Sequence, residues 1–107
     1  MNMIMVTKDL LLITGENKIS IINVNNYKLR IIKVPGSGDI EGICMLNQNI
    51  LLTGDDKKII RQWRIEGDNL ILISKKEKAH DDLITDLLNL GNGHIASCSW
   101  DKTIKIW

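Results

Sequence analysis

The chain has 107 residues, a formal net charge of +1 and 44% hydrophobic residues. This length suits one domain, and the near-neutral charge gives no field that would favour nucleic acid or an anionic membrane. The longest apolar run, residues 10–13, is too short to cross a bilayer. Residues 1–6 lack the basic segment and the small-residue cleavage site of a secretory signal. We therefore expect an intracellular protein, cytoplasmic or nuclear, without nucleic-acid or membrane partners.

Short runs of branched aliphatic residues, separated by turn residues, follow one another along the whole chain. Isoleucine and valine favour strands, and no segment shows the apolar spacing of a helix. The predicted strands are, in chain order, residues 3–7, 10–14, 19–24, 29–34, 41–46, 50–54, 59–65, 70–74, 83–90, 94–99 and 103–107. This pattern predicts an all-β protein built from hairpins.

The last third of the chain repeats the middle third with an offset of 44 residues. Ile104-Lys105-Ile106-Trp107 lies over Ile60-Arg61-Gln62-Trp63, and Ser97 lies over Thr53. Residues 19–22 match the same four-residue unit more weakly, so the first third of the chain is the first of three copies. A fixed period in the forties is typical of repeat arrays of small sheets.

The third copy resembles a WD40 repeat. The resemblance is carried by Ala79-His80, by Ile95-Ala96-Ser97-Cys98-Ser99, by Asp101-Lys102-Thr103-Ile104 and by Trp107. Alanine replaces the family's glycine at position 79, and no aspartate follows Trp107. The family fold is a β-propeller, in which each repeat supplies one four-stranded blade of a ring of about 4–8 blades. The resemblance thus implies a partial WD40-like propeller with blades at about residues 2–35, 39–75 and 79–107, the last without its outermost strand.

Four residues match the positions that form a buried hydrogen-bonded relay in WD40 repeats: His80, Ser97, Asp101 and Trp107. A buried indole N–H needs an acceptor, a hydroxyl can pass the chain on to an imidazole, and the second imidazole nitrogen needs a carboxylate. The second copy offers a partial relay of Thr53, Asp56 and Trp63, with Asp55 as the alternative acid. Its histidine position falls on Gly36, so that relay is incomplete.

The same residue types allow a second interpretation, in which Ser97, His80 and an aspartate form a hydrolase triad. Against this interpretation, the sequence has no Gly-x-Ser-x-Gly elbow, and Ser97 falls in the middle of a predicted strand. We expect the relay to be structural and the protein not to be an enzyme. His94 and the acidic pairs lack the spacing of metal ligands, and no glycine-rich phosphate loop is present, so we expect no metal and no cofactor.

The family resemblance implies a platform for binding other proteins. Trp100 precedes the relay acid, at a position that often lies on the partner-binding face, and an exposed tryptophan would make a strong anchor. The alternative is that Trp100 packs against a neighbouring blade. Weaker candidates for partner contacts are Leu83, Thr85, Glu41 and Asp55.

Three blades cannot close a ring, so apolar sheet faces and an unpaired edge would remain open at the ends. We favour the interpretation that the remaining blades belong to a longer propeller. The alternative is a self-assembling module, in which copies of the chain close the ring as a homo-oligomer.

Overall fold

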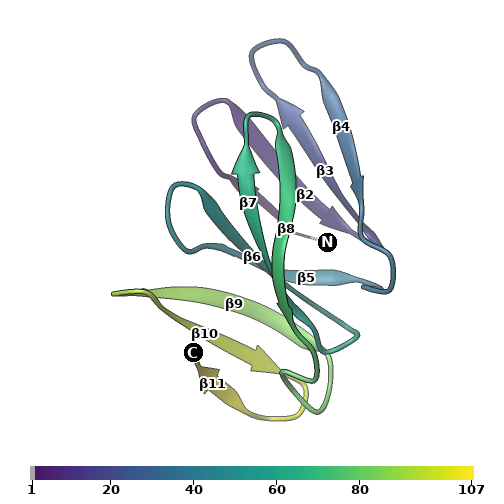
Figure 1. The fold of residues 1–107 in the computed structure, drawn as a ribbon. Coiled ribbons are helices and arrows are strands. Elements are labelled where there is room, and N and C mark those ends of the chain that lie inside the picture. The colour runs from purple at the N-terminus through teal and green to yellow at the C-terminus, as the bar shows by residue number, and fades with distance from the viewer. Residues whose placement is uncertain (1) are drawn as a thin grey trace.

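A computed structural model describes residues 2–107, and this part of the chain contains eleven strands and no helix (Figure 1). No segment of it is therefore a helix long and apolar enough to cross a membrane. The strands are β1 (Met3–Met5), β2 (Leu10–Gly15), β3 (Lys18–Asn23), β4 (Leu29–Lys33), β5 (Ile40–Met45), β6 (Ile50–Asp55), β7 (Ile60–Glu66), β8 (Asn69–Lys76), β9 (Ile84–Gly91), β10 (His94–Ser99) and β11 (Ile104–Ile106).

The strands form three separate antiparallel sheets, each made from one continuous part of the chain. The first sheet has the order β1-β2-β3-β4, the second β5-β6-β7-β8, and the third β11-β10-β9. Every neighbouring pair is a hairpin, as the short turn clusters of the sequence predict. The predicted all-β class with WD40-like sheets is therefore confirmed.

The turns preserve the 44-residue offset in their backbone geometry. Lys58 and Lys102 both have φ of 70°, a left-handed conformation that is uncommon outside glycine. Each closes a tight turn by donating its N–H, to Asp55 O at 3.3 Å in the second sheet and to Ser99 O at 3.2 Å in the third. The second and third sheets are thus copies in turn conformation as well as in sequence.

Three strands are shorter than the sequence predicts: those predicted over residues 3–7, 29–34 and 103–107. The strand predicted over residues 3–7 ends at Met5, because the Thr7 hydroxyl accepts the N–H groups of Asp9 and Leu10, each at 3.1 Å. This side chain therefore turns the backbone before the second strand begins.

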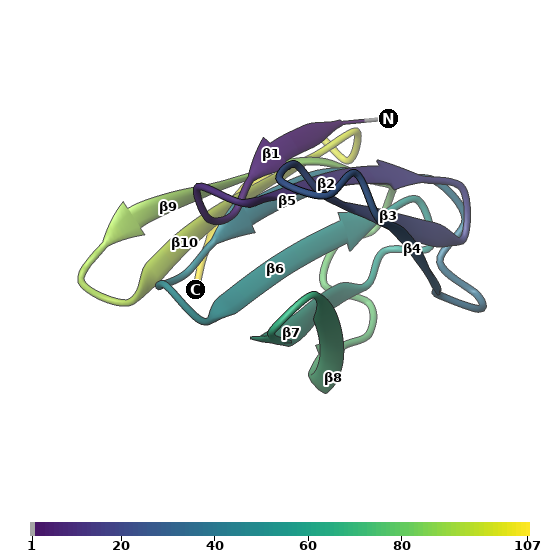
Figure 2. The same cartoon turned by 90° about the horizontal axis from the view of Figure 1, so that it is seen from above.

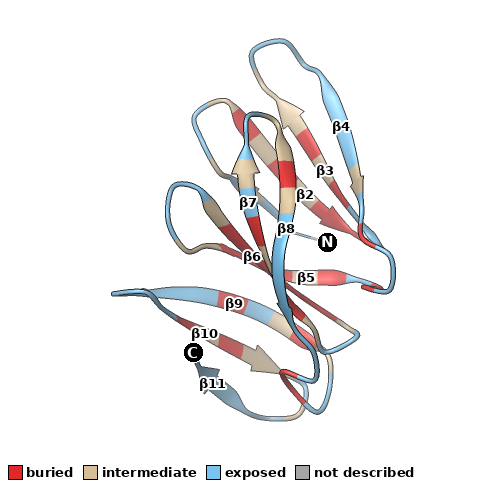
Figure 3. Cartoon of the chain, viewed as in Figure 1, coloured by how far each residue is buried: buried red, intermediate tan, exposed pale blue. Residues whose placement is uncertain are grey.

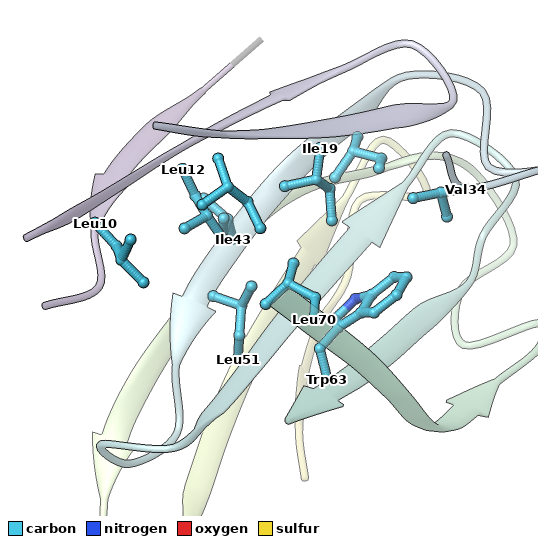
Figure 4. Close-up of a cluster of buried hydrophobic side chains, with 10 residues drawn as sticks. Leu10, Leu12, Ile19, Val34, Ile43, Leu51, Trp63 and Leu70 are labelled. Atoms are coloured by element: carbon cyan, nitrogen blue, oxygen red, sulfur yellow. The ribbon is translucent and has the colours of Figure 1, made fainter. Parts of the chain in front are cut away.

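The first and second sheets pack face to face around a shared apolar core, with β2 running beside β5 (Figures 1 and 2). Figure 4 shows Leu12 and Ile19 of the first sheet facing Leu51 and Trp63 of the second. The whole cluster is Leu10, Leu12, Ile19, Ile21, Val34, Ile40, Ile43, Leu51, Trp63 and Leu70. Burial on both faces explains why β5 and β6 of the second sheet are mainly apolar, without a clean alternation of polar and apolar residues.

The second and third sheets pack in the same way, with β9 lying against β5 and β6. Their core consists of Cys44, Leu52, Ile60, Ala79, Ile84, Leu87 and Ile95. Glycine permits the close approach, because a Cβ built at Gly54 would lie only 2.6 Å from Ile84 Cγ2. The outer strands at the two ends of the stack, β4 and β11, remain largely exposed (Figure 3).

Candidate functional site

The structure brings the four relay residues of the third sheet into one hydrogen-bonded chain. The Trp107 indole N–H donates to Ser97 Oγ at 2.8 Å, and Ser97 Oγ lies 2.7 Å from His80 Nε2. The other ring nitrogen, His80 Nδ1, lies 2.9 Å from Asp101 Oδ2. Ser97 comes from the middle of β10, while His80 precedes β9 and Asp101 lies in the turn before β11. The hydrogen bonds between these side chains therefore connect three segments that are separate in the sequence.

The contacts fix a consistent direction of hydrogen bonding. Because the indole nitrogen can only donate, Ser97 Oγ accepts from Trp107 and can donate its own proton to His80 Nε2. His80 Nδ1–H then donates to the Asp101 carboxylate. In this tautomer every polar hydrogen of the relay has an acceptor.

Further donors surround the Asp101 carboxylate. The Thr103 hydroxyl donates to Oδ1 at 2.5 Å, and the Asp81 N–H donates to Oδ2 at 3.0 Å. These bonds, led by that from Thr103 and joined by that from His80, hold the pKa of Asp101 well below its usual range. Asp101 thus carries a negative charge that ties the loop before β9 to the turn before β11.

The location of Ser97 disfavours nucleophilic chemistry. Ser97 and His80 are each 1% exposed, and Ser97 lies in the central strand of its sheet. A serine nucleophile must present Oγ to a substrate, with oxyanion donors beside it. The geometry is that of a side-chain network that satisfies buried polar groups.

The second sheet holds a shorter version of this chain. The Trp63 indole N–H donates to Thr53 Oγ1 at 3.0 Å, and both side chains are buried. Glycine at position 36 offers no ring to continue the chain, as the sequence predicts. The Thr53–Trp63 pair therefore stands alone.

The acid of this second copy differs from our first choice. Asp56 does not extend the pair, and its Oδ1 is buried without a hydrogen-bond partner in residues 2–107. Asp55 instead holds the turn, since its Oδ1 accepts the N–H groups of Lys57 at 2.9 Å and Ile59 at 3.2 Å. Its Oδ2 pairs with the buried Arg61 guanidinium.

Asp55 is also the one partner-binding candidate that burial contradicts. It is 1% exposed and engaged by Arg61, so no partner can reach it. This ion pair was not among the sequence predictions. A usable signal was present, because Arg61 and Lys105 occupy equivalent positions and both are basic. The Lys105 ammonium donates to Ala79 O at 2.8 Å, so each cation contacts a buried residue, Asp55 in the second sheet and Ala79 before the third.

Trp100 stands at the surface, with 67% of its area exposed. Its backbone is fixed, because Trp100 N–H donates to Leu83 O at 3.1 Å in the segment before β9. The side chain lines a depression of about 320 Å³ with two other candidates, Leu83 and Thr85. The remaining lining residues are Asp39, Glu41 and Asp56. Four of the five predicted contact residues therefore surround one depression between the second and third sheets.

The other polar candidates are not grouped into a metal centre. In the part of the chain that the structure describes, no three His, Cys, Asp or Glu side chains are placed to hold a metal ion. His94 is exposed, with Nδ1 3.1 Å from Asn92 O. Both cysteines are free, and burial followed by the charge of Asp86 raises the pKa of the Cys44 thiol to about 11.

Comparison with known proteins agrees with this geometry. Residues 73–107 match the family "WD domain, G-beta repeat", and the match includes all of β9, β10 and β11. This segment of the chain is therefore similar to a WD40 repeat. It is also 34% identical over 64 residues to the small ribosomal subunit protein RACK1 of Schizosaccharomyces pombe. The similarity covers 57% of this chain and 20% of that protein, so the chain spans about a fifth of the length of the curated relative it matches.

Proposed function

We propose that this chain is a non-catalytic platform for protein–protein interactions, with the depression around Trp100 as its contact site. The proposal rests mainly on Trp100: its side chain is exposed, and its backbone N–H is fixed by a hydrogen bond to Leu83 O. Tryptophan side chains dominate binding energy at interfaces, and a rigid backbone lowers the entropy lost on binding.

The family and the relative support a scaffold role. WD40 repeats generally mediate contacts between proteins, and the relative is named as a component of the small ribosomal subunit. That name also supports an intracellular location for this chain.

The relay and the domain limits belong to the same proposal. We propose that the relay stabilises the third sheet, because it joins β10 to the loop before β9 and to the turn before β11. We assign the three sheets to blades at about residues 2–35, 39–75 and 79–107. In this arrangement the relay holds the loop that carries Leu83 and the turn that carries Trp100, and so fixes the contact site.

The platform proposal is tested by cross-linking in cells, followed by mass spectrometry, with the wild type, Trp100→Ala and Tyr27→Ala. Tyr27 is the matched control, since it is an aromatic residue with 82% exposure at the far end of the first sheet. We expect a set of cross-linked proteins that disappears with Trp100→Ala and persists with Tyr27→Ala. Identical sets from all three proteins would refute the contact site.

The hydrolase alternative has a simpler test. Rates of hydrolysis of p-nitrophenyl acetate should be the same for the wild type and Ser97→Ala, because the buried hydroxyl cannot reach an ester. A rate that falls to background only in the variant would establish the triad instead.

A further inference from the structure

The depression around Trp100 has two walls of different chemical character. Its lining residues are three pairs of equivalent positions, 44 residues apart: Asp39 and Leu83, Glu41 and Thr85, and Asp56 and Trp100. At each pair the second sheet contributes an acid and the third sheet an uncharged residue. One wall is therefore acidic, and the other carries the apolar surface of Leu83 and Trp100.

The same backbone hydrogen bond holds both walls in place. The Asp56 N–H donates to Asp39 O at 3.0 Å in the second sheet, just as the Trp100 N–H donates to Leu83 O at 3.1 Å in the third. Asp39 and Asp56 are therefore neighbours in space, although one precedes β5 and the other follows β6. Because both walls are held by the fold, a ligand of the depression loses little entropy in ordering them.

The negative charge of the acidic wall is not balanced inside the depression. The whole chain has 14 basic and 13 acidic side chains, yet no lysine or arginine of residues 2–107 is among the residues that line this depression. Asp56 Oδ1 is also buried against Gly38 without a hydrogen-bond partner in the same residues. An unpaired buried acceptor is costly, and a positively charged donor beside the carboxylate lowers that cost.

An arginine side chain has groups that suit both walls. Its guanidinium carries five N–H donors in one plane, pairs with carboxylates and stacks on aromatic rings. An indole ring also attracts a cation placed over its face. The apolar stem of the arginine can cover apolar surface such as that of Leu83. Lysine has the same charge but lacks the planar group, so it matches the depression less well.

We propose that the depression binds an arginine side chain of a partner protein, with the guanidinium against the carboxylates of Asp39 and Asp56 and over the ring of Trp100. Glu41 already takes part in an interaction within the protein, so we assign the cation to the other two acids. This inference rests on the contact site proposed above and adds the chemistry of its partner. Both walls belong to the second and third sheets, so the site is formed within the described chain.

The test is an NMR titration of the full chain that follows the indole N–H signal of Trp100. The probe is the peptide Gly-Ser-Arg-Ser-Gly with blocked ends, compared with peptides in which citrulline, lysine or glutamate replaces the arginine. We expect the arginine peptide to shift the signal to saturation. The citrulline and glutamate peptides should bind about tenfold more weakly or less, because they lack the charge-assisted hydrogen bonds, and the lysine peptide should lie between them.

The acidic wall is tested with a double variant, Asp39→Asn with Asp56→Asn. Its dissociation constant for the arginine peptide should rise about fivefold, since two carboxylate pairs are lost. Glu77→Gln is the matched control, because Glu77 is an exposed acid outside the depression and should leave the affinity unchanged. Raising the salt from about 0.1 M to about 1 M should weaken wild-type binding, because the Debye length falls from about 10 Å to about 3 Å.

Three results overturn the arginine assignment: a citrulline, lysine or glutamate peptide that binds as tightly as the arginine peptide, a double variant that binds like Glu77→Gln, or a Trp100 signal that no peptide shifts. Asp39→Asn alone repeats the test if far-UV circular dichroism shows that the double variant does not fold, because Asp39 is exposed. The contact site itself is tested separately by the cross-linking experiment. Cross-linked proteins that disappear with Trp100→Ala while the peptides fail would keep the contact site and remove the arginine, whereas cross-linked proteins that persist would remove the contact site.

Discussion

Replacing Ser97 with alanine tests the relay at its centre. The change removes the donor to His80 Nε2 and the acceptor of the Trp107 indole N–H. His80 is 1% exposed, so its nitrogen is left without a partner, at a cost of about 1–3 kcal/mol. Trp107 is 38% exposed, and its indole N–H can turn to water at a smaller cost. We expect the free energy of unfolding to fall by about 2–3 kcal/mol in total.

Urea unfolding at one protein concentration, followed by far-UV circular dichroism, measures this change, with an unchanged dependence on urea as the sign of an intact fold. Ser74→Ala is the matched control, because its hydroxyl makes only an exposed 3.2 Å contact with Gln62 and should change stability by less than about 0.5 kcal/mol. A Ser97→Ala variant no less stable than Ser74→Ala would refute the relay's contribution.

Three further outcomes follow from the same geometry. Thr53→Val keeps the side-chain shape but leaves the buried Trp63 indole N–H without an acceptor, so urea unfolding should show a loss of about 1–3 kcal/mol, and an unchanged midpoint would contradict this. Because the pKa of Asp101 is lower in the folded state than the unfolded value of about 3.9, its stabilising effect is complete above that pH and is lost as the pH falls below it. Asp101→Asn should therefore weaken the loss of stability in acid, and equal losses in both proteins would contradict the assignment. With its pKa raised to about 11, Cys44 in a Cys98→Ser background should react with a thiol reagent at pH 8 about a hundredfold or more slowly than after urea unfolding, and equal rates would show that it is not buried.

The fold was predictable because its signals are local. Branched aliphatic runs and turn residues specify each hairpin, and the 44-residue offset specifies that hairpins of the same kind recur. Strand ends were less predictable, since they depend on single side chains such as Thr7, which turns the backbone two residues after β1 ends. The order of the sheets in space follows from the chain, because each sheet is one continuous segment.

The site was predictable where the residues repeat the family pattern and unpredictable where they depart from it. His80, Ser97, Asp101 and Trp107 match that pattern, and the structure places them in one chain of hydrogen bonds. In the second sheet Arg61 supplies a charge that the pattern does not describe.

That charge changes the roles of the two neighbouring acids. Asp55 is buried as the partner of Arg61, and Asp56 is left outside the network. Which of two adjacent acids faces inward depends on the conformation of the turn, which residue types alone do not give.

Hydrogen exchange of the three tryptophan indole N–H groups, followed by NMR, distinguishes the two indoles held by side-chain hydrogen bonds from the exposed one. We predict the slowest exchange at Trp63, which is 4% exposed and donates to Thr53, and slower exchange at Trp107 than at Trp100. Trp100, with 67% exposure, should exchange as fast as a free indole. A Trp100 signal protected like that of Trp63 would rule out an exposed Trp100, and a Trp107 signal that exchanges as fast as Trp100 would rule out its hydrogen bond to Ser97.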